Sequence, residues 1–184
     1  MLVVIALTGA SAIACGKQNT QAFPNVSASE AANAPDLSLR GVAFARTADG
    51  RITARGTAQH LDYRRAGGLL NADVTAMTLV PQAGSQLATF GLLNLSAPHV
   101  KGELQEKSGN AWGGVKVAAT RGDRGATEAV EYRGELITSE KPVQLSGPGY
   151  VMHGNGMVMQ ADGSFMRLTH GVTGTLHEAV EAAK

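Results

Sequence analysis

The chain has little of what nucleic-acid-binding or disulfide-stabilised proteins contain. Its only cysteine is Cys15, so no disulfide can form within the chain. The 16 basic and 15 acidic residues are spread without blocks and give a net charge of +1, which excludes nucleic-acid binding through a basic face. Aromatic residues make up only 4% of the sequence. What remains is a mildly apolar chain of 184 residues, long enough for one domain with a core.

Recognisable catalytic patterns are absent as well. There is no Gly-x-Ser-x-Gly nucleophile motif and no phosphate-binding loop of the Walker type. The acidic residues are scattered, and the histidines show no metal-ligand spacing, so we expect them at the solvated surface. We predict a protein that is not an enzyme and needs no metal or cofactor. One alternative stays open, an enzyme whose polar site is assembled from distant residues; the histidines concerned are His60, His99, His153, His170 and His177.

The N-terminal residues predict export. The apolar run 2–7 is followed by small residues and by Ala12-Ile-Ala-Cys15, which resembles a bacterial lipoprotein box. Residues 1–14 are therefore predicted to be a signal peptide and Cys15 the lipidated first residue, although no Lys or Arg precedes the apolar run. An incidental cysteine in an ordinary signal peptide is the alternative. The polar segment 15–36 is predicted to be a disordered tether between a membrane and a folded domain.

Glycine, by contrast, is abundant, with 23 residues, and it separates short apolar runs that alternate with period two. Such runs between turn dipeptides, as at Asp49-Gly50 and Asp162-Gly163, are typical of consecutive antiparallel strands. We read Arg121-Gly-Asp123 as a turn rather than an adhesion motif. The stretch 101–114, which contains the only tryptophan, is predicted to be an irregular loop. The sequence thus predicts one all-β domain over 37–177 and a short helical tail over 178–184.

Four of the six methionines lie between Ile137 and Leu176, namely Met152, Met157, Met159 and Met166. Methionine is flexible and polarizable, so it suits variable apolar partners. The same side chains also fill gaps in ordinary cores, and periodicity alone leaves both interpretations open.

Several segments follow one another in an order that resembles the LptC member of the LptA/LptC/OstA-like family of lipopolysaccharide-transport proteins. The match spans 37–176, and its order matters more than any one motif. The segments 39–42, 49–54 and 58–63 together resemble the opening strands of the family. They are followed by ATEAVEY (126–132), ITSEKPVQL (137–145), GNGM (154–157) and GVTG (171–174).

This resemblance implies a twisted, open antiparallel β-jellyroll in which two facing sheets enclose an apolar groove for lipopolysaccharide acyl chains. Alternation then nominates groove residues: Leu70, Val74, Val117, Val130, Leu145, Met157, Met159, Phe165 and Leu168. The resemblance also implies edge-to-edge strand pairing with other jellyroll proteins and with an inner-membrane transporter complex. For those edges we nominate Leu37, Leu39, Val42, Val172, Thr173 and Thr175.

The predicted location rests on the lipoprotein box and on the family resemblance. A periplasmic domain held at a membrane by Cys15 is expected, whereas family members commonly use a transmembrane helix. The resemblance favours the inner membrane, but Gly16 is not the usual Asp retention signal, so the outer membrane stays open. The alternative function is a structural or adhesive surface lipoprotein with a filled β core and no lipid ligand.

Overall fold

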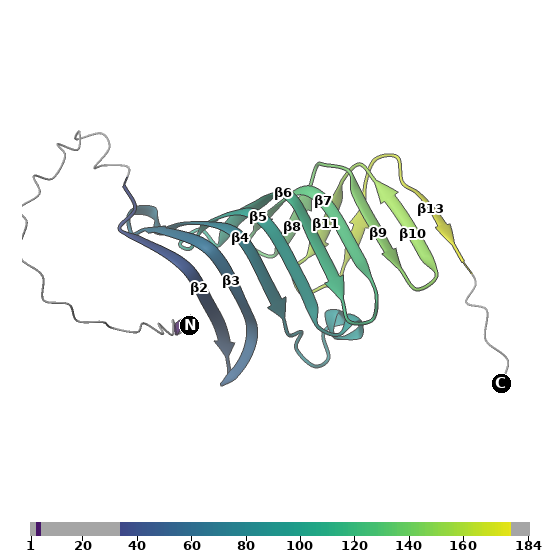
Figure 1. Cartoon of the computed structure of the whole chain (residues 1–184). Helices are drawn as coiled ribbons and strands as arrows, with labels where there is room; N and C mark the ends of the chain where they lie inside the picture. The colour runs from purple at the N-terminus through teal and green to yellow at the C-terminus, as the bar shows by residue number, and fades with distance from the viewer. Residues whose placement is uncertain (1–2, 5–33, 178–184) are drawn as a thin grey trace, which may run out of the picture.

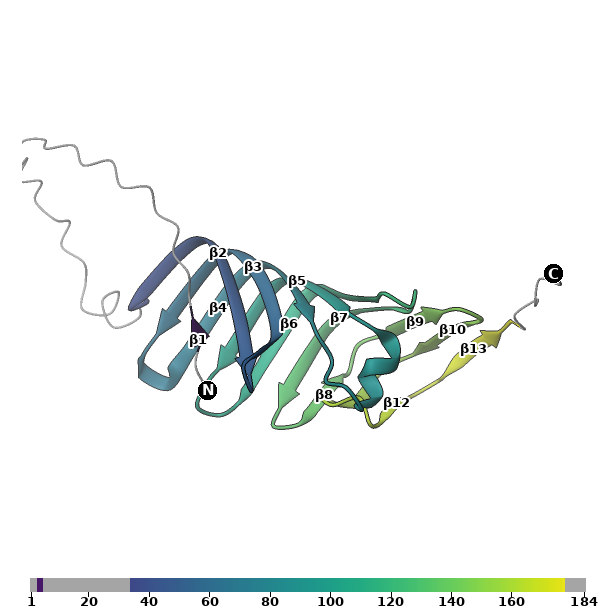
Figure 2. The same ribbon diagram turned by 90° about the horizontal axis from the view of Figure 1, so that it is seen from below.

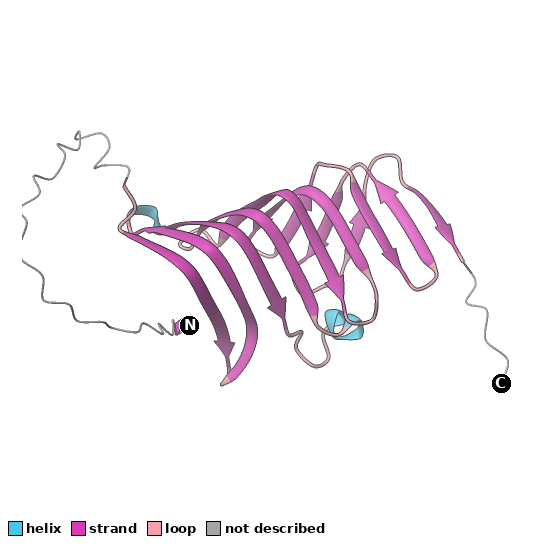
Figure 3. Ribbon diagram, viewed as in Figure 1, coloured by secondary structure: helices cyan, strands magenta, loops and turns pink. Residues whose placement is uncertain are grey.

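The computed structural model describes residues 3–4 and 34–177, which form one continuous antiparallel sheet of 13 strands (Figure 1). Two short 3₁₀ helices, η1 (Ala66–Gly68) and η2 (Gln86–Phe90), interrupt it (Figure 3). The predicted all-β, open antiparallel jellyroll is confirmed. The strands are β1 (Val3–Val4), β2 (Leu37–Ala48), β3 (Arg51–Arg64), β4 (Leu69–Leu79), β5 (Leu93–Glu103), β6 (Ser108–Ala119), β7 (Arg124–Arg133), β8 (Leu136–Ser139), β9 (Val143–Gly147), β10 (Tyr150–Gly154), β11 (Met157–Gln160), β12 (Met166–Leu168) and β13 (Thr173–Leu176).

Several of the long strands carry an irregularity near the middle. Gly41 in β2 has φ 61°, and Val74 in β4 has φ 48°. In β6, Gly113 and Gly114 have φ 86° and 98°, and the pairing registers with β5 and β7 both shift there. A residue in this left-handed region breaks the regular alternation of side chains, so both halves of a strand can turn apolar side chains to the same side. We call this line of irregularities the bend.

The bend divides the sheet into two walls. Residues 124–127 of β7 pair with β9, whereas residues 131–133 pair with β8. Seen from below, the extensions beyond β7 diverge, with β8 and β12 on one side and β9, β10 and β13 on the other (Figure 2). The β8 wall comprises 37–40, 60–64, 69–73, 99–103, 108–112, 129–133, β8, β11 and β12; the β9 wall comprises 42–48, 51–58, 75–79, 93–97, 115–119, 124–127, β9, β10 and β13.

Ser139, the last residue of β8, stabilises the bend through hydrogen bonds. Its side chain is buried, and its Oγ donates to the Ala129 carbonyl oxygen at 2.7 Å. The same Oγ accepts from the Lys141 backbone N–H at 3.2 Å and lies 3.0 Å from Thr127 Oγ1. One hydroxyl thus holds β7 and the β8–β9 connection together.

The segment between β4 and β5 reaches from the β9 wall to the β8 wall. It carries η2, whose Leu87 lies against Gly163 in the β11–β12 turn so closely that a Cβ at that glycine would collide with the leucine. At the other end of η2, the Arg121 guanidinium lies over the Phe90 ring, 4.3 Å from its centroid. η2 therefore joins the walls at one point.

A polar cluster supports η2. Arg121 donates to both carboxylate oxygens of Asp123, at 2.6 and 2.8 Å, and the Tyr150 hydroxyl donates to Asp123 Oδ1 at 2.8 Å. The hydrogen bonds from Arg121 hold the pKa of the Asp123 carboxyl below its ordinary value, against the opposing effect of burial. Burial, reinforced by Asp123, raises the pKa of Tyr150. The predicted Arg121-Gly-Asp123 turn thus contacts β10 and η2 through its side chains. Its Gly122 has a φ of 106°.

Two local predictions differ from the structure. The stretch 101–114 is not a loop but the β5–β6 hairpin, in which Glu103 pairs with Ser108. Its alternation is hidden because glycines occupy positions in both strands. Asp49-Gly50 forms the tight turn with both φ values positive, whereas at Asp162-Gly163 only the glycine has a positive φ. There the Asp162 carboxylate instead accepts from the Ser164 N–H at 2.9 Å. Cys15, most of the predicted signal peptide and tether, and the predicted helical tail lie outside the described residues.

Candidate functional site

Both walls present a row of mainly apolar side chains to the space between them. On the β9 wall, a Cβ at Gly56 would meet the Phe44 ring, and one at Gly125 would meet Val117 and Leu145, so these side chains share one face. The pairing registers extend this row across the wall: Phe44, Gly56, Met77, Leu95, Val117, Gly125, Leu145 and Met152.

The β8 wall carries two corresponding rows. Next to the bend lie Leu39, Leu61, Ala72, Val100, Ala111, Val130, Ser139, Met157 and Leu168. Farther from it lie Leu37, Tyr63, Leu70, Gly102, Gly109, Tyr132, Ile137, Met159 and Met166. The residues between these rows point to solvent and are mainly polar, including Asn71, Lys101, Asn110 and Glu131.

The inward rows are not sealed by their own packing. Within the described residues, eight apolar residues are buried, four of them alanines, and no side chain is less than 2% exposed. Phe44, Met77, Leu95 and Val117 remain half-buried. A close-packed core of this size would bury its large side chains completely, so the two apolar faces are incompletely covered.

Seven of the nine nominated groove residues lie in these inward rows. Leu70, Val130, Met157, Met159 and Leu168 are on the β8 wall, and Val117 and Leu145 on the β9 wall. The structure places the other two elsewhere. Val74 lies at the bend and is 52% exposed, because its positive φ interrupts the alternation. Phe165 lies in the β11–β12 turn and is 46% exposed, because β12 begins only at Met166.

Sequence reasoning missed several inward residues, including Phe44, Met77 and Leu95. The same alternation marks them, but its phase changes at each irregularity of the bend. Phe44 carried an additional indication, because it faces Gly56, whose missing side chain leaves room for the ring.

The nominated edge residues lie at opposite ends of the sheet. Leu37, Leu39 and Val42 are in β2. Among the described residues, β2 pairs with β3 on one side and with β1 on the other, at Ala45 and Arg46. Thr173 and Thr175 are in β13, whose partner is β10, and Val172 directly precedes that strand. The side chain of Val42 is buried, so only its backbone faces the edge.

Charged groups in the described part of the chain lie mainly on the outer surfaces. His99 Nδ1 lies 2.8 Å from Asp73 Oδ1, and the His99 ring stacks on Trp112 with centroids 5.5 Å apart. His60 pairs with Asp62 at 3.0 Å. Among the described residues, no group of three or more His, Cys, Asp or Glu side chains is placed to hold a metal ion.

The two-walled sheet with inward apolar rows defines the class as an open β-jellyroll protein. The sequence matches the family model described as "Lipopolysaccharide-assembly, LptC-related" over residues 1–178. The chain belongs to this family, and the resemblance found in the sequence is confirmed. No curated protein matches the sequence. In the part of the chain that the structure describes, none of the helices has the length and apolar character needed to cross a bilayer.

Proposed function

We propose that this protein is a non-enzymatic carrier that holds lipopolysaccharide acyl chains between its two walls and passes them to the next jellyroll. Membership of the family supports a general role in lipopolysaccharide transport. The finer proposal rests on one observation: two facing sets of apolar rows whose large side chains are only half-buried. Such surfaces gain about 0.8 kcal/mol for each acyl methylene that they remove from water.

The composition of the rows suits transfer rather than storage. The seven predicted groove residues that lie in the rows are aliphatic or methionine side chains from both walls, with Met157 and Met159 adjacent to Leu168 and Met166 in the pairing register. Each contact is weak and tolerant of chain position, so a lipid can be released as well as bound. Energy for directional movement then comes from an ATPase elsewhere in the transport machine.

The two ends of the sheet are the proposed contacts with other components. Edge strands offer unpaired N–H and C=O groups, to which a strand of a partner can add. β2, with Leu37 and Leu39, and β13, with Thr173 and Thr175, lie at opposite ends and would link an inner-membrane transporter complex to another jellyroll protein. We further propose that lipidated Cys15 and the segment 15–36 hold the domain 37–177 at a membrane in the periplasm, the inner membrane in preference to the outer.

A structural or adhesive lipoprotein with a filled core is the second candidate. The incomplete burial of Phe44, Met77 and Leu95 favours the carrier, because a filled core of that kind would enclose these side chains.

Two neighbouring residues of β11 provide the test. Met159 belongs to an inward row, whereas Val158 pairs with Arg167 and Thr138 on the outer face. Met159→Asp places a carboxylate against bound acyl chains, where its desolvation is costly, so we expect labelled lipopolysaccharide to bind the purified protein at least about tenfold more weakly. Val158→Asp should leave affinity within about twofold.

Urea unfolding of both variants controls for loss of the fold. If Met159→Asp folds and binds lipopolysaccharide as tightly as the unaltered protein, the acyl chains do not lie between the walls. Equal weakening by both substitutions would likewise contradict the proposal.

A further inference from the structure

The outer face of the β9 wall carries a long hollow of about 900 Å³. Two parallel rows of outward side chains border it. Between these rows the lining includes residues of the inward row, namely Phe44, Gly56, Met77, Leu95, Val117 and Gly125. The row nearer the bend comprises Ala43, Thr57, Ala76, Ser96, Lys116, Ala126 and Gln144. The row farther from the bend comprises Arg55, Thr78, Asn94, Ala118, Arg124 and Ser146. We call this hollow the outer furrow.

Small residues create the outer furrow. Alanine occurs at Ala43, Ala76, Ala118 and Ala126, and glycine contributes to its floor at Gly56 and Gly125. It crosses seven neighbouring strands from β2 to β9, and with strands about 4.8 Å apart its length is roughly 29 Å. The furrow is therefore long enough for an extended chain of several units.

The charge of the outer furrow is of one sign. Arg55, Lys116 and Arg124 line it, whereas no Asp or Glu does. None of the three forms an ion pair with another described residue. Lys116 pairs with Ala126, two residues from Arg124, so these two cations are diagonal neighbours on adjacent strands and can reach the same anionic group.

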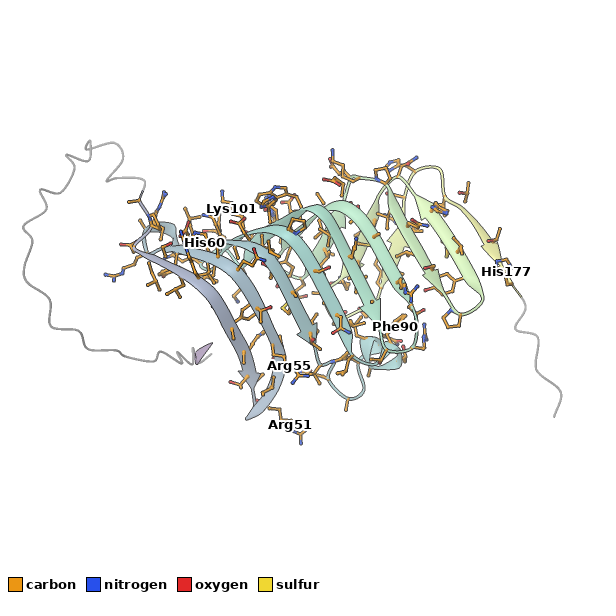
Figure 4. The ribbon with its side chains drawn as sticks, viewed as in Figure 1. Arg51, Arg55, His60, Phe90, Lys101 and His177 are labelled. Atoms are coloured by element: carbon orange, nitrogen blue, oxygen red, sulfur yellow. The ribbon has the colours of Figure 1, made fainter. Side chains whose placement is uncertain are left out.

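Arg55, which lines the furrow, lies near the lower ends of the strands as drawn in Figure 4. Lys101, on the β8 wall, lies across the bend from it near the top of the molecule. The other polar groups of the furrow are neutral hydroxyls and amides, from Thr57, Thr78, Asn94, Ser96, Gln144 and Ser146. Cations together with hydroxyl and amide donors are the groups that bind phosphate and sugar oxygens.

We propose that the outer furrow binds an extended phosphorylated saccharide. The strands that it crosses are paired on both sides over most of this region, so a peptide cannot add there by strand pairing and recognition must come from side chains. The large apolar residues of the lining, Phe44, Met77, Leu95 and Val117, belong to the inward row, so none stands in the two outward rows as an anchor for a peptide. The hollow form of the furrow does not suit a flat membrane surface. This site goes beyond the acyl-chain site, because it lies on the opposite face of the same wall.

The test is binding of a delipidated, phosphorylated oligosaccharide to the full chain, measured by titration calorimetry at low and high salt. Lys116→Ala combined with Arg124→Ala should weaken binding at least about tenfold, since each removes a charge-assisted contact. Lys101→Ala removes an exposed cation from the outer face of the other wall and should change affinity less than about twofold. Added salt should weaken binding to the unaltered protein.

Three comparisons decide the outcome. The phosphatase-treated oligosaccharide should bind at least about tenfold more weakly than the phosphorylated one, since it lacks the groups that the cations contact. No binding, or equal losses in the furrow and Lys101 variants, would overturn the site. Inorganic tripolyphosphate binding as tightly would overturn the saccharide assignment in favour of free phosphate, and tighter binding of poly-glutamate would overturn it in favour of an acidic peptide.

Discussion

At the scale of single residues, buried polar groups stabilise the bend and the β6–β7 turn of this sheet. Ser139 is one of two buried polar residues in the described part of the chain, and Asp123 is the other. Each is hydrogen-bonded to residues from more than one segment of the chain. Removing either side chain therefore deprives two or more neighbouring groups of a hydrogen bond at once.

Ser139→Ala should lower the free energy of unfolding by about 1–3 kcal/mol, because the Ala129 carbonyl and the Lys141 N–H lose their partner. Urea denaturation measures this loss. Ser96→Ala, at an exposed position of β5, is the matched control and should change stability by less than about 0.5 kcal/mol. Equal effects of the two substitutions would show that Ser139 does not fasten the bend.

Asp123 should make stability depend on pH in the acid range. Its pKa is depressed in the folded state, so its contribution is complete above the ordinary aspartate pKa of about 3.9 and is lost as pH falls through the folded value. We expect Asp123→Asn to be less stable at neutral pH, and the difference in melting temperature to shrink as pH drops below about 4. Thermal unfolding over a pH series measures it; a constant difference down to pH 2 would contradict the assignment.

At the scale of elements, η2 connects the two walls at a point away from the bend. Among the described contacts, it is the one such connection that we identify. Gly163→Ala brings a methyl group against Leu87 and should separate η2 from the β11–β12 turn. Gly50→Ala is a close control, because its φ of 73° is nearly that of Gly163 at 76°, while a Cβ there meets open space.

Both substitutions incur the conformational cost of a side chain at positive φ, about 1 kcal/mol. Gly163→Ala should cost about 1–3 kcal/mol more than Gly50→Ala in urea unfolding, owing to the collision. If the two variants are equally stable, the contact between η2 and the turn contributes nothing to the fold.

The elements also show what sequence could and could not predict. Alternation and turn dipeptides are local, so the strands around Asp49-Gly50 and the all-β class could be predicted. The bend could not, because it depends on backbone conformations such as that of Val74, which a β-branched residue rarely adopts. Beyond each irregularity the inward set changes phase, and for that reason strict alternation selects Val74 and misses Phe44 and Met77.

At the scale of the whole molecule, the two faces of one wall have different chemistry. The inward face of the β9 wall is apolar and half-covered, and its outward face is hollow and cationic. The family resemblance predicted the first from ordered motifs. The outer furrow depends on residues from seven strands that come together only through the pairing register, so no single stretch of sequence indicates it.

Photo-crosslinking from β7 and β9 tests the central claim, that acyl chains lie between the walls, most directly. A photoreactive residue at Val130 or Tyr132, on the inner rows of the β8 wall, should label lipopolysaccharide in cells, and so should one at Leu145 on the β9 wall. The same residue at Glu131, between Val130 and Tyr132 but facing outward, should not. Equal labelling at Glu131, or no labelling from either wall, would contradict the account.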